Sequence, residues 1–244
     1  MIHDSKKWFS SWFDTPFYHI LYKDRNDVEA QAFMDTLTNY LNFPESGKIL
    51  DLACGKGRHS VYLNTLGYNV TGVDLSENSI AHAKQFENDT LHFKVHDMCL
   101  PFGEQFDGVF NLFTSFGYFD NDEDNLNTIK AIKTDFNEHG FGVIDFMNSD
   151  FVIETLVPEE VKVVEGISFF LRRYVQDGYI LKDINFSFEG NNYNFQERVR
   201  AFSLLDFEKL FEQAHVSLLD VFGDYKLSKF NAKSSERLVN NHPC

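Results

Sequence analysis

The chain has 244 residues, enough for one large α/β domain or for a domain with a sizeable insertion. Hydrophobic residues make up 43% of it and charged residues 24%, which excludes an intrinsically disordered chain. The formal net charge of -15 argues against DNA or RNA as a substrate, because a negative protein repels phosphate backbones.

Cysteine content and hydropathy narrow the class of protein further. Three cysteines, Cys54, Cys99 and Cys244, are too few and too scattered for a disulfide framework or a zinc site, so we expect no metal. No apolar run reaches the roughly 18 residues that cross a membrane. The N-terminus has mixed charge, unlike a signal peptide. We therefore expect a cytoplasmic protein with no membrane or nucleic-acid partner.

The first two thirds of the chain predict alternating strands and helices. Residues 1–26 are rich in aromatic side chains, and residues 27–42 carry apolar residues at a helical spacing. Apolar runs predict strands at about 48–53, 68–73, 91–95, 106–113 and 141–146, and helices are expected to start near Gly57, Ser76 and Asp122. This alternation predicts a doubly wound, mostly parallel α/β sheet with helices on both faces.

The pattern changes after Asn148. Turn dipeptides separate β-rich runs within residues 160–202: Glu165-Gly166, Asp177-Gly178 and Glu189-Gly190. We interpret this segment as two or three antiparallel strands, inserted after the fifth strand of the sheet. A helix at about 204–214 and a strand at about 216–222 return to the main sheet, and Ser235–Asn240 is a candidate final edge strand.

The most informative stretch runs from Ile49 to His59, where an apolar run ends at Asp51 and turns through Gly55 and Gly57 into a helix. Glycines without Cβ atoms let a ligand approach the backbone. The dinucleotide fingerprint requires a third glycine where this chain has Ser60. Asp51 would repel a pyrophosphate but would face the ammonium of a methionine moiety, directly or through water. S-adenosylmethionine is favoured over NAD, and a tight turn without ligand is the structural alternative.

Two further carboxylates follow strands. Asp74 ends the next strand and can accept hydrogen bonds from both ribose hydroxyls. Its alternative role is that of an acid at a helix N-terminus, where Ser76 would be the better cap. Leu75 would lie beside the adenine. Asp97, after the third strand, can accept from the adenine amino group while Met98 packs on the ring, and its alternative is a solvated loop acid.

The exit of the fourth strand, Phe113–Tyr118, occupies the position where open α/β sheets bind ligands. Backbone groups near Phe113 are expected to meet the methionine moiety. Thr114, Ser115 and Tyr118 are expected to line the side of the methyl acceptor.

Together these residues resemble the class I S-adenosylmethionine-dependent methyltransferases over about Ile49–Asn148. The chain is similar to a small-molecule branch with a Cys-Gly-x-Gly-Arg-His loop, a Phe-Thr-Ser-Phe-Gly-Tyr exit, an inserted β hairpin and a Gly-Asp-Tyr segment. The resemblance implies a Rossmann-like seven-stranded sheet. It also implies in-line methyl transfer from S-adenosylmethionine to a small or medium-sized acceptor, with S-adenosylhomocysteine as product. The expected cofactor-binding residues are Tyr18, Tyr22, Asp51, Ala53, Gly55, Gly57, Asp74, Leu75, Asp97, Met98 and Phe113.

Methyl transfer needs an aligned nucleophile, a dry site and in some cases a proton acceptor. His59 and Tyr118 are the candidate catalytic residues, and Asp145, Tyr18 and Tyr22 are further candidate proton acceptors. His59 is equally well a histidine of the first helical turn that only packs locally, and Asp145 has a structural alternative.

Aromatic residues near the N-terminus are expected to form a lid over the cleft: Trp8, Trp12, Tyr18 and Tyr22. The alternative is an aromatic helix permanently buried on the domain. Arg198 and Arg200 share one strand face. They suit an anionic acceptor, but pairing with acidic residues on a solvated hairpin face is the favoured interpretation.

A single methyltransferase domain is expected to fill residues 1–244. Its parts are the lid and helices (1–42), a cofactor-binding core (43–150), the β-hairpin insertion (151–203) and the return to the sheet (204–244). The insertion suits either a monomer or a homodimer formed through it. The alternative function is a non-catalytic cofactor-binding or scaffold protein with the same fold.

Overall fold

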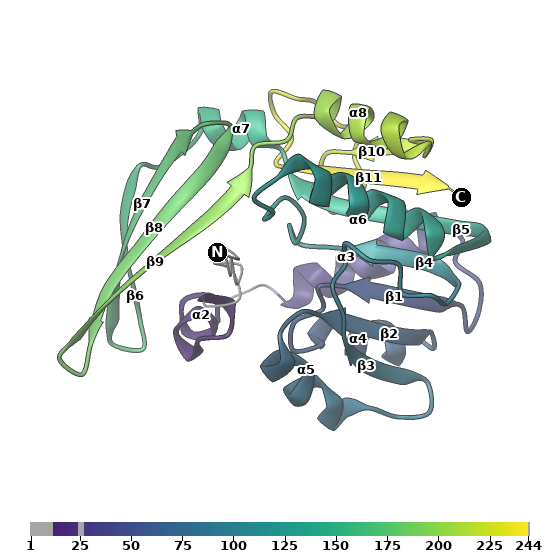
Figure 1. Ribbon diagram of the computed structural model, residues 1–244, viewed down its shortest axis with the longest axis horizontal. Coiled ribbons are helices and arrows are strands. Elements are labelled where there is room, and N and C mark those ends of the chain that lie inside the picture. The colour runs from purple at the N-terminus through teal and green to yellow at the C-terminus, as the bar shows by residue number, and fades with distance from the viewer. Residues whose placement is uncertain (1–11, 24–26, 244) are drawn as a thin grey trace, which may run out of the picture.

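Two β-sheets and the helices around them form the computed structural model, which describes residues 12–23 and 27–243 (Figure 1). The larger sheet has seven strands in the order β10-β11-β5-β4-β1-β2-β3. The smaller sheet has four strands in the order β6-β7-β8-β9, and it stands to one side of the larger sheet (Figure 1). Trp8, a member of the expected lid, lies outside the described residues.

The large sheet confirms the predicted doubly wound, mostly parallel architecture. Its first five strands are β1 (Lys48–Leu52), β2 (Asn69–Asp74), β3 (Leu91–Val95), β4 (Phe106–Asn111) and β5 (Phe136–Met147). All pairs among these five strands are parallel. Their carboxyl ends therefore meet at one edge of the sheet, where the sequence analysis expects ligands.

Helices cover both faces of this sheet. One face carries α3 (Asp27–Tyr40), α4 (Arg58–Thr65), α5 (Glu77–Ala83) and the short η1 (Lys84–Phe86), and the other carries α6 (Asp122–Thr134) and α8 (Leu204–Ala214). Leu37, Leu63 and Ile80 belong to the buried cluster of the first face. Ile129 and Phe207 belong to the cluster of the second. The inner strands β1 and β4 are thus buried on both faces, whereas the edge strand β3 has exposed residues on one of them.

The C-terminal strand is interior, which corrects the expected edge strand at Ser235–Asn240. Strand β11 (Arg237–Pro243) pairs antiparallel with both β5 and β10 (Asp220–Phe222), and β10 forms the edge. The sequence does not indicate an interior strand here, because Asn240, Asn241 and His242 are polar residues typical of an exposed end of a strand. All three are nevertheless buried, next to a fully buried Val239.

The insertion forms four strands, where two or three were expected. After the short α7 (Ser149–Glu154) come β6 (Glu159–Val164), β7 (Ile167–Gln176), β8 (Tyr179–Phe188) and β9 (Asn191–Arg200). All three predicted turns are confirmed, and both central residues of each have positive φ, for example 52° at Asp177 and 76° at Gly178. Such two-residue turns match the twist of the flanking strands. Three turns separate four runs, so the fourth strand follows from turns that the sequence already indicates; Val161 and Val163 of β6 are exposed.

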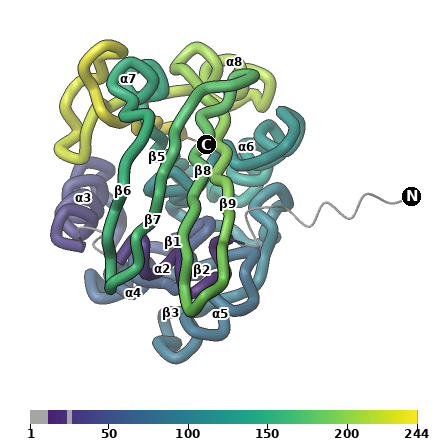
Figure 2. The backbone as a smooth tube through the Cα atoms, turned by 90° about the vertical axis from the view of Figure 1, so that its left-hand side faces the viewer, coloured from purple at the N-terminus to yellow at the C-terminus, as the bar shows by residue number. Residues whose placement is uncertain are grey.

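Helix α2 (Pro16–Leu21) packs on the small sheet rather than on the large one. Thr15 caps it by accepting the N–H of Tyr18 at 3.2 Å. Trp12 and Leu21 are buried in a cluster with residues of the small sheet, namely Val164, Ile167, Phe169, Leu171, Ile184 and Phe186. Figure 2 looks onto the small sheet and shows α2 behind it, on the side of the large sheet.

One partly buried carboxylate holds α2 in place. Glu197 of β9 accepts from the Trp12 indole N–H at 2.8 Å and from the Tyr22 hydroxyl at 2.6 Å. The Lys182 ammonium lies 3.4 Å from the same carboxylate and also donates to the Tyr22 hydroxyl. The Trp12 indole, the Tyr22 hydroxyl and the Lys182 ammonium therefore all contact the Glu197 carboxylate. Without Glu197, these three donors would lose their shared acceptor.

Glu197→Gln should loosen α2. The amide has one oxygen and no charge for three donors, and hydrogen bonds to charged groups are worth about 1.5–3 kcal/mol. Hydrogen exchange of a peptide covering residues 12–23 should accelerate by about tenfold or more. Glu159→Gln, at an exposed glutamate of β6, is the matched control. Equal exchange in the two variants would contradict the anchoring role.

His242 should make stability fall in acid. It is completely buried, its two ring nitrogens have no hydrogen-bond partner within residues 12–23 and 27–243, and burial lowers its pKa to about 3. The unfolded chain has a histidine pKa of about 6.5 and thus binds more protons below that pH. The His242 contribution to the free energy of unfolding should therefore decline from about pH 6.5 towards pH 3, with a limiting slope of about 1.4 kcal/mol per pH unit.

Denaturant unfolding of His242→Leu between pH 7 and pH 4 checks this slope. The variant should lose less stability on acidification than the wild type. His139→Leu, at an exposed histidine, should behave like the wild type. Identical pH dependence in His242→Leu and the wild type would refute the assignment.

Candidate functional site

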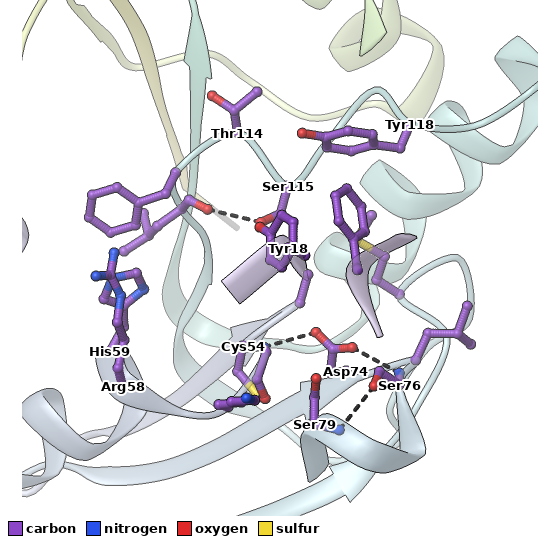
Figure 3. A pocket seen from close by; sticks show the side chains of 18 of the residues that line it. Tyr18, Cys54, Arg58, His59, Asp74, Ser76, Ser79, Thr114, Ser115 and Tyr118 are labelled. Carbon is purple, nitrogen blue, oxygen red and sulfur yellow. Dashed lines mark hydrogen bonds between the residues drawn. The ribbon is translucent and has the colours of Figure 1, made fainter. Parts of the chain in front are cut away.

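A cavity of about 460 Å³ lies where the carboxyl ends of the parallel strands face α2 (Figure 3). Its walls come from the loops after β1, β2, β3 and β4 and from the N-terminal segment. The large sheet therefore supplies one half of the cavity and the segment held by the small sheet supplies the other.

The loop after β1 curves through left-handed backbone. Ala53, Gly55 and Gly57 have φ values of 58°, 56° and 82°. A Cβ at Gly55 would meet nothing within 4 Å, so its backbone is open to a ligand. Gly57 precedes α4, and a Cβ there would lie 2.6 Å from the ring of Phe93. Ala53 and Gly55 line the cavity, whereas Gly57 lies behind it and serves the packing of the loop.

Asp74 joins this loop to the next helix. Its carboxylate accepts the N–H of Gly55 and the N–H of Ser76, each at 2.8 Å, and lines the cavity. Burial raises the pKa of Asp74, and the two N–H groups oppose that shift. Ser76 is the cap of α5, as expected, and accepts the N–H of Ser79 at 2.9 Å. The remaining lone pairs of Asp74 are of the kind that accept from ribose hydroxyls.

Asp51 lies one layer behind the cavity wall. Its side chain is only 2% exposed, does not line the cavity, and accepts from the Ser60 hydroxyl at 2.6 Å. Burial raises the pKa of Asp51 to about 7; the Ser60 hydrogen bond opposes this shift and the Asp74 charge adds to it. Asp51 was expected to face the ammonium directly or through water, and its place behind the wall leaves the contact through water as the prediction. Ser60 stands where a dinucleotide-binding loop has glycine, and its hydroxyl donates the hydrogen bond that the buried Asp51 carboxylate needs.

The loop after β3 and the start of α5 form the wall on the side expected for adenine. Leu75, Asp97 and Met98 all line the cavity, together with His96. Asp97 accepts the N–H of Cys99 at 3.1 Å, which fixes its carboxylate near the loop. His96 was not predicted for this wall.

The opposite wall is aromatic. Phe13 lies between Tyr18 and Tyr118, with ring centroids 4.9 and 5.4 Å away, and Tyr22 lies 5.0 Å from Tyr18. All four line the cavity. Trp12 does not, because it is buried between α2 and the small sheet. Of the expected lid residues that the structure describes, Tyr18 and Tyr22 thus face the cavity and Trp12 is buried.

The N-terminal segment also touches the cofactor half. Asp14 accepts a hydrogen bond from the Ser76 hydroxyl, next to Asp74. The segment therefore bridges the two halves of the cavity.

The two candidate catalytic residues both line the cavity. His59 stacks on Phe113 with centroids 4.2 Å apart, so it packs locally and faces the cavity at once. Tyr118 is part of the aromatic wall. Figure 3 shows His59 beside Arg58 and apart from Tyr118. Several other lining residues had no predicted role in a cavity, namely His19, Lys23, Asp27, Arg58, Ser79 and Phe119. Of these, His19 and Lys23 are four residues apart, like Tyr18 and Tyr22, and this helical spacing would have indicated them.

Asp145 is structural, which removes it as a proton acceptor. It is fully buried and accepts from the Phe113 N–H at 2.8 Å, the Tyr225 hydroxyl at 3.2 Å and two Arg237 nitrogens at 2.6 and 2.8 Å. It does not line the cavity. Arg237 was not predicted, and its cue is a lone cation at the start of a buried strand.

Arg198 and Arg200 do not line the cavity. They pair with Asp120 at 2.8 Å and Asp122 at 3.4 Å and lie over the Tyr179 ring. The favoured interpretation, pairing with acidic residues, is confirmed. The two ion pairs connect β9 to the residues that follow Tyr118, at the start of α6.

No group of three or more histidine, cysteine, aspartate or glutamate side chains gathers as a metal site within residues 12–23 and 27–243. In the same part of the chain no helix is long and apolar enough to cross a membrane.

Comparisons with known proteins agree with this geometry. Residues 49–151 match the family described as methyltransferase domain. The chain is 29% identical over 227 residues to the putative methyltransferase YqeM of Bacillus subtilis (strain 168), covering 87% of this chain and 91% of that one. It is 34% identical over 127 residues, half of each chain, to the dTDP-3-amino-3,4,6-trideoxy-alpha-D-glucopyranose N,N-dimethyltransferase of Streptomyces venezuelae.

A solved structure shares the fold. The S-adenosylmethionine-dependent methyltransferase from Clostridium acetobutylicum ATCC 824 superposes with a TM-score of 0.78 at 20% identity, over 93% of this chain and 95% of that one. At this identity the likeness speaks for the fold alone. Residues 49–151 thus match a methyltransferase domain, and the fold and the relatives agree with the resemblance to the class I S-adenosylmethionine-dependent methyltransferases.

Proposed function

We propose that the cavity holds S-adenosylmethionine and a small-molecule acceptor side by side and that the enzyme methylates this acceptor. One observation carries the proposal. A single cavity joins the glycine loop and Asp74 on one side to an aromatic wall from α2 and the β4 exit on the other. A cofactor with a ribose, an adenine and a cationic end fits the first side, and the second remains for the acceptor.

The residues of the first side fit the parts of the cofactor. Asp74 would hold the ribose hydroxyls, and Leu75, Asp97 and Met98 would enclose the adenine. The open backbone at Ala53, Gly55 and Phe113 would receive the methionine half, with Asp51 behind it as a negative charge for the ammonium. Tyr18 and Tyr22 would close the cofactor from the other side.

When bound, S-adenosylmethionine supplies an electrophilic methyl group on a sulfonium. The chain's own task is then to align the acceptor and exclude water. Phe13, Tyr18 and Tyr118 provide an apolar, rigid wall for both purposes. His59 is the remaining candidate for taking up a proton besides Tyr18 and Tyr118. Burial and the Glu197 carboxylate raise the pKa of the Tyr22 hydroxyl well above its usual value, so it stays protonated and is no base.

An amine nitrogen is the acceptor atom we propose to test first. The Streptomyces venezuelae relative is, by its name, an N,N-dimethyltransferase of an amino sugar. Aromatic rings such as Tyr18 and Tyr118 attract ammonium groups through their faces. This favours an amine acceptor, which gives up its proton on entering the site and attacks as the neutral amine; the nitrogen then gains the positive charge as the sulfonium becomes a neutral thioether.

S-adenosylhomocysteine should bind the protein with a micromolar dissociation constant, on the order of −7 to −8 kcal/mol. The combined glycine loop and Asp74 give the physical reason. Titration calorimetry measures it, and a panel of radiolabelled methyl-transfer reactions with small amines tests turnover. A folded protein that shows no binding at millimolar ligand would overturn the proposal. Binding without turnover on any acceptor class would favour the non-catalytic alternative.

Asp74→Ala should weaken S-adenosylhomocysteine binding by about 1.5–3 kcal/mol, since the ribose hydroxyls lose a charged acceptor. Asp107→Ala is the matched control. That aspartate also accepts a backbone N–H, from Lys48 at 2.7 Å, but does so at the other end of the sheet. Calorimetry should find its affinity close to that of the wild type. Equal affinities of Asp74→Ala and the wild type would place the ribose elsewhere.

A further inference from the structure

Two successive residues at the exit of β4 adopt left-handed backbone although neither is glycine. Phe113 and Thr114 both have a φ of 59°. Residues with a Cβ rarely adopt such values, and β-branched threonine is a clear outlier there. Strain of this kind persists only where the surrounding structure enforces it, and it gathers at functional sites.

Asp145 on the neighbouring strand β5 and Arg237 on β11, one strand further, enforce this turn. Asp145 accepts the Phe113 N–H at 2.8 Å through its side chain, and its backbone carbonyl accepts the Thr114 N–H at 3.0 Å. Arg237 donates to the Thr114 hydroxyl at 2.8 Å and to the Asp145 carboxylate at 2.6 Å. Both N–H groups and the hydroxyl of the turn are therefore fixed.

Tyr225 also helps to hold the Phe113–Thr114 turn. The Tyr225 hydroxyl donates to Asp145 at 3.2 Å, and the Arg237 guanidinium lies over the Tyr225 ring, 5.3 Å from its centroid. The Tyr225 ring also packs against Phe113, with centroids 5.5 Å apart. This aromatic ring thus touches the turn and the ion pair that holds it.

The Phe113–Thr114 turn lines the cavity. The side chains that hold it do not: Asp145, Tyr225 and Arg237. Phe113, Thr114 and Ser115 line the cavity, and Figure 3 shows Thr114 and Ser115 on the strand exit above the cofactor side. Asp145 is fully buried, and the Arg237 side chain is 18% exposed. The shape of the cavity wall is therefore set by an ion pair one layer behind it.

We propose that Asp145, together with Arg237 and Tyr225, is a positioning residue that shapes the Phe113–Thr114 turn for the methionine half of the cofactor. The inference rests on the proposed function. Asp74 and its neighbours bind the adenosine half from different strands. Disturbing the turn should therefore affect ligands that reach beyond the ribose and spare those that do not.

Calorimetry with two probes, S-adenosylhomocysteine and adenosine, separates these effects. In Asp145→Asn the affinity for S-adenosylhomocysteine should fall by about tenfold or more, while that for adenosine should change by less than about threefold. Asp135→Asn is the matched control. Asp135 is also a buried carboxylate, at the other end of β5, and accepts the N–H groups of Phe102 and Gly103. It should lower stability without changing the ratio of the two affinities.

If Asp145→Asn does not fold, the affinities for S-adenosylhomocysteine and adenosine can be compared in Arg237→Lys instead. Lysine keeps the charge but lacks the fork that reaches Asp145 and Thr114 together. A second mutation, Thr114→Gly, adds a readout that a general loss of stability would not give. Glycine adopts the left-handed region without steric cost. It should therefore recover about threefold or more of the lost S-adenosylhomocysteine affinity in either variant.

The outcomes are distinct. Equal losses for both ligands, or no recovery with Thr114→Gly, would overturn the positioning role while leaving the proposed function intact. A folded wild-type protein that binds neither ligand would overturn the proposed function and this inference with it.

Discussion

Left-handed turns at the carboxyl ends of β1 and β4, each held by a carboxylate from the neighbouring strand, are the constraint on which the site depends. Asp74 of β2 accepts the Gly55 N–H at the first turn, and Asp145 of β5 accepts the Phe113 N–H at the second. Each turn carries the chain out of the sheet within a few residues. Backbone and side chains can then face one cavity instead of continuing the strands.

Asp51 and Asp74 give the site an unmet preference for positive charge. Burial raises the pKa of both carboxyls, that of Asp51 to about 7, because their ionised forms are costly without a cation nearby. A nearby cation favours the ionised form of a buried carboxylate. The sulfonium and ammonium of the cofactor are such cations, so ligand and site are expected to stabilise each other's charge.

Features with a local cause could be predicted from the sequence. The three insertion turns, the Ser76 cap and the glycine loop each depend on residues next to them in the chain. Features that depend on distant partners could not. The role of Glu197 depends on the packing of β9 against α2, and the role of Arg237 depends on the pairing of β11 with β5. The depth of Asp51 behind the cavity wall is likewise a property of packing.

A crystal structure of the protein with S-adenosylhomocysteine tests the central claim most directly. The account predicts ligand density in the cavity with the ribose hydroxyls on Asp74 and the sulfur turned towards the aromatic wall of Tyr18 and Tyr118. The Phe113–Thr114 turn should keep its left-handed backbone and meet the homocysteine half. Ligand bound elsewhere, or with its ribose away from Asp74, would contradict the account.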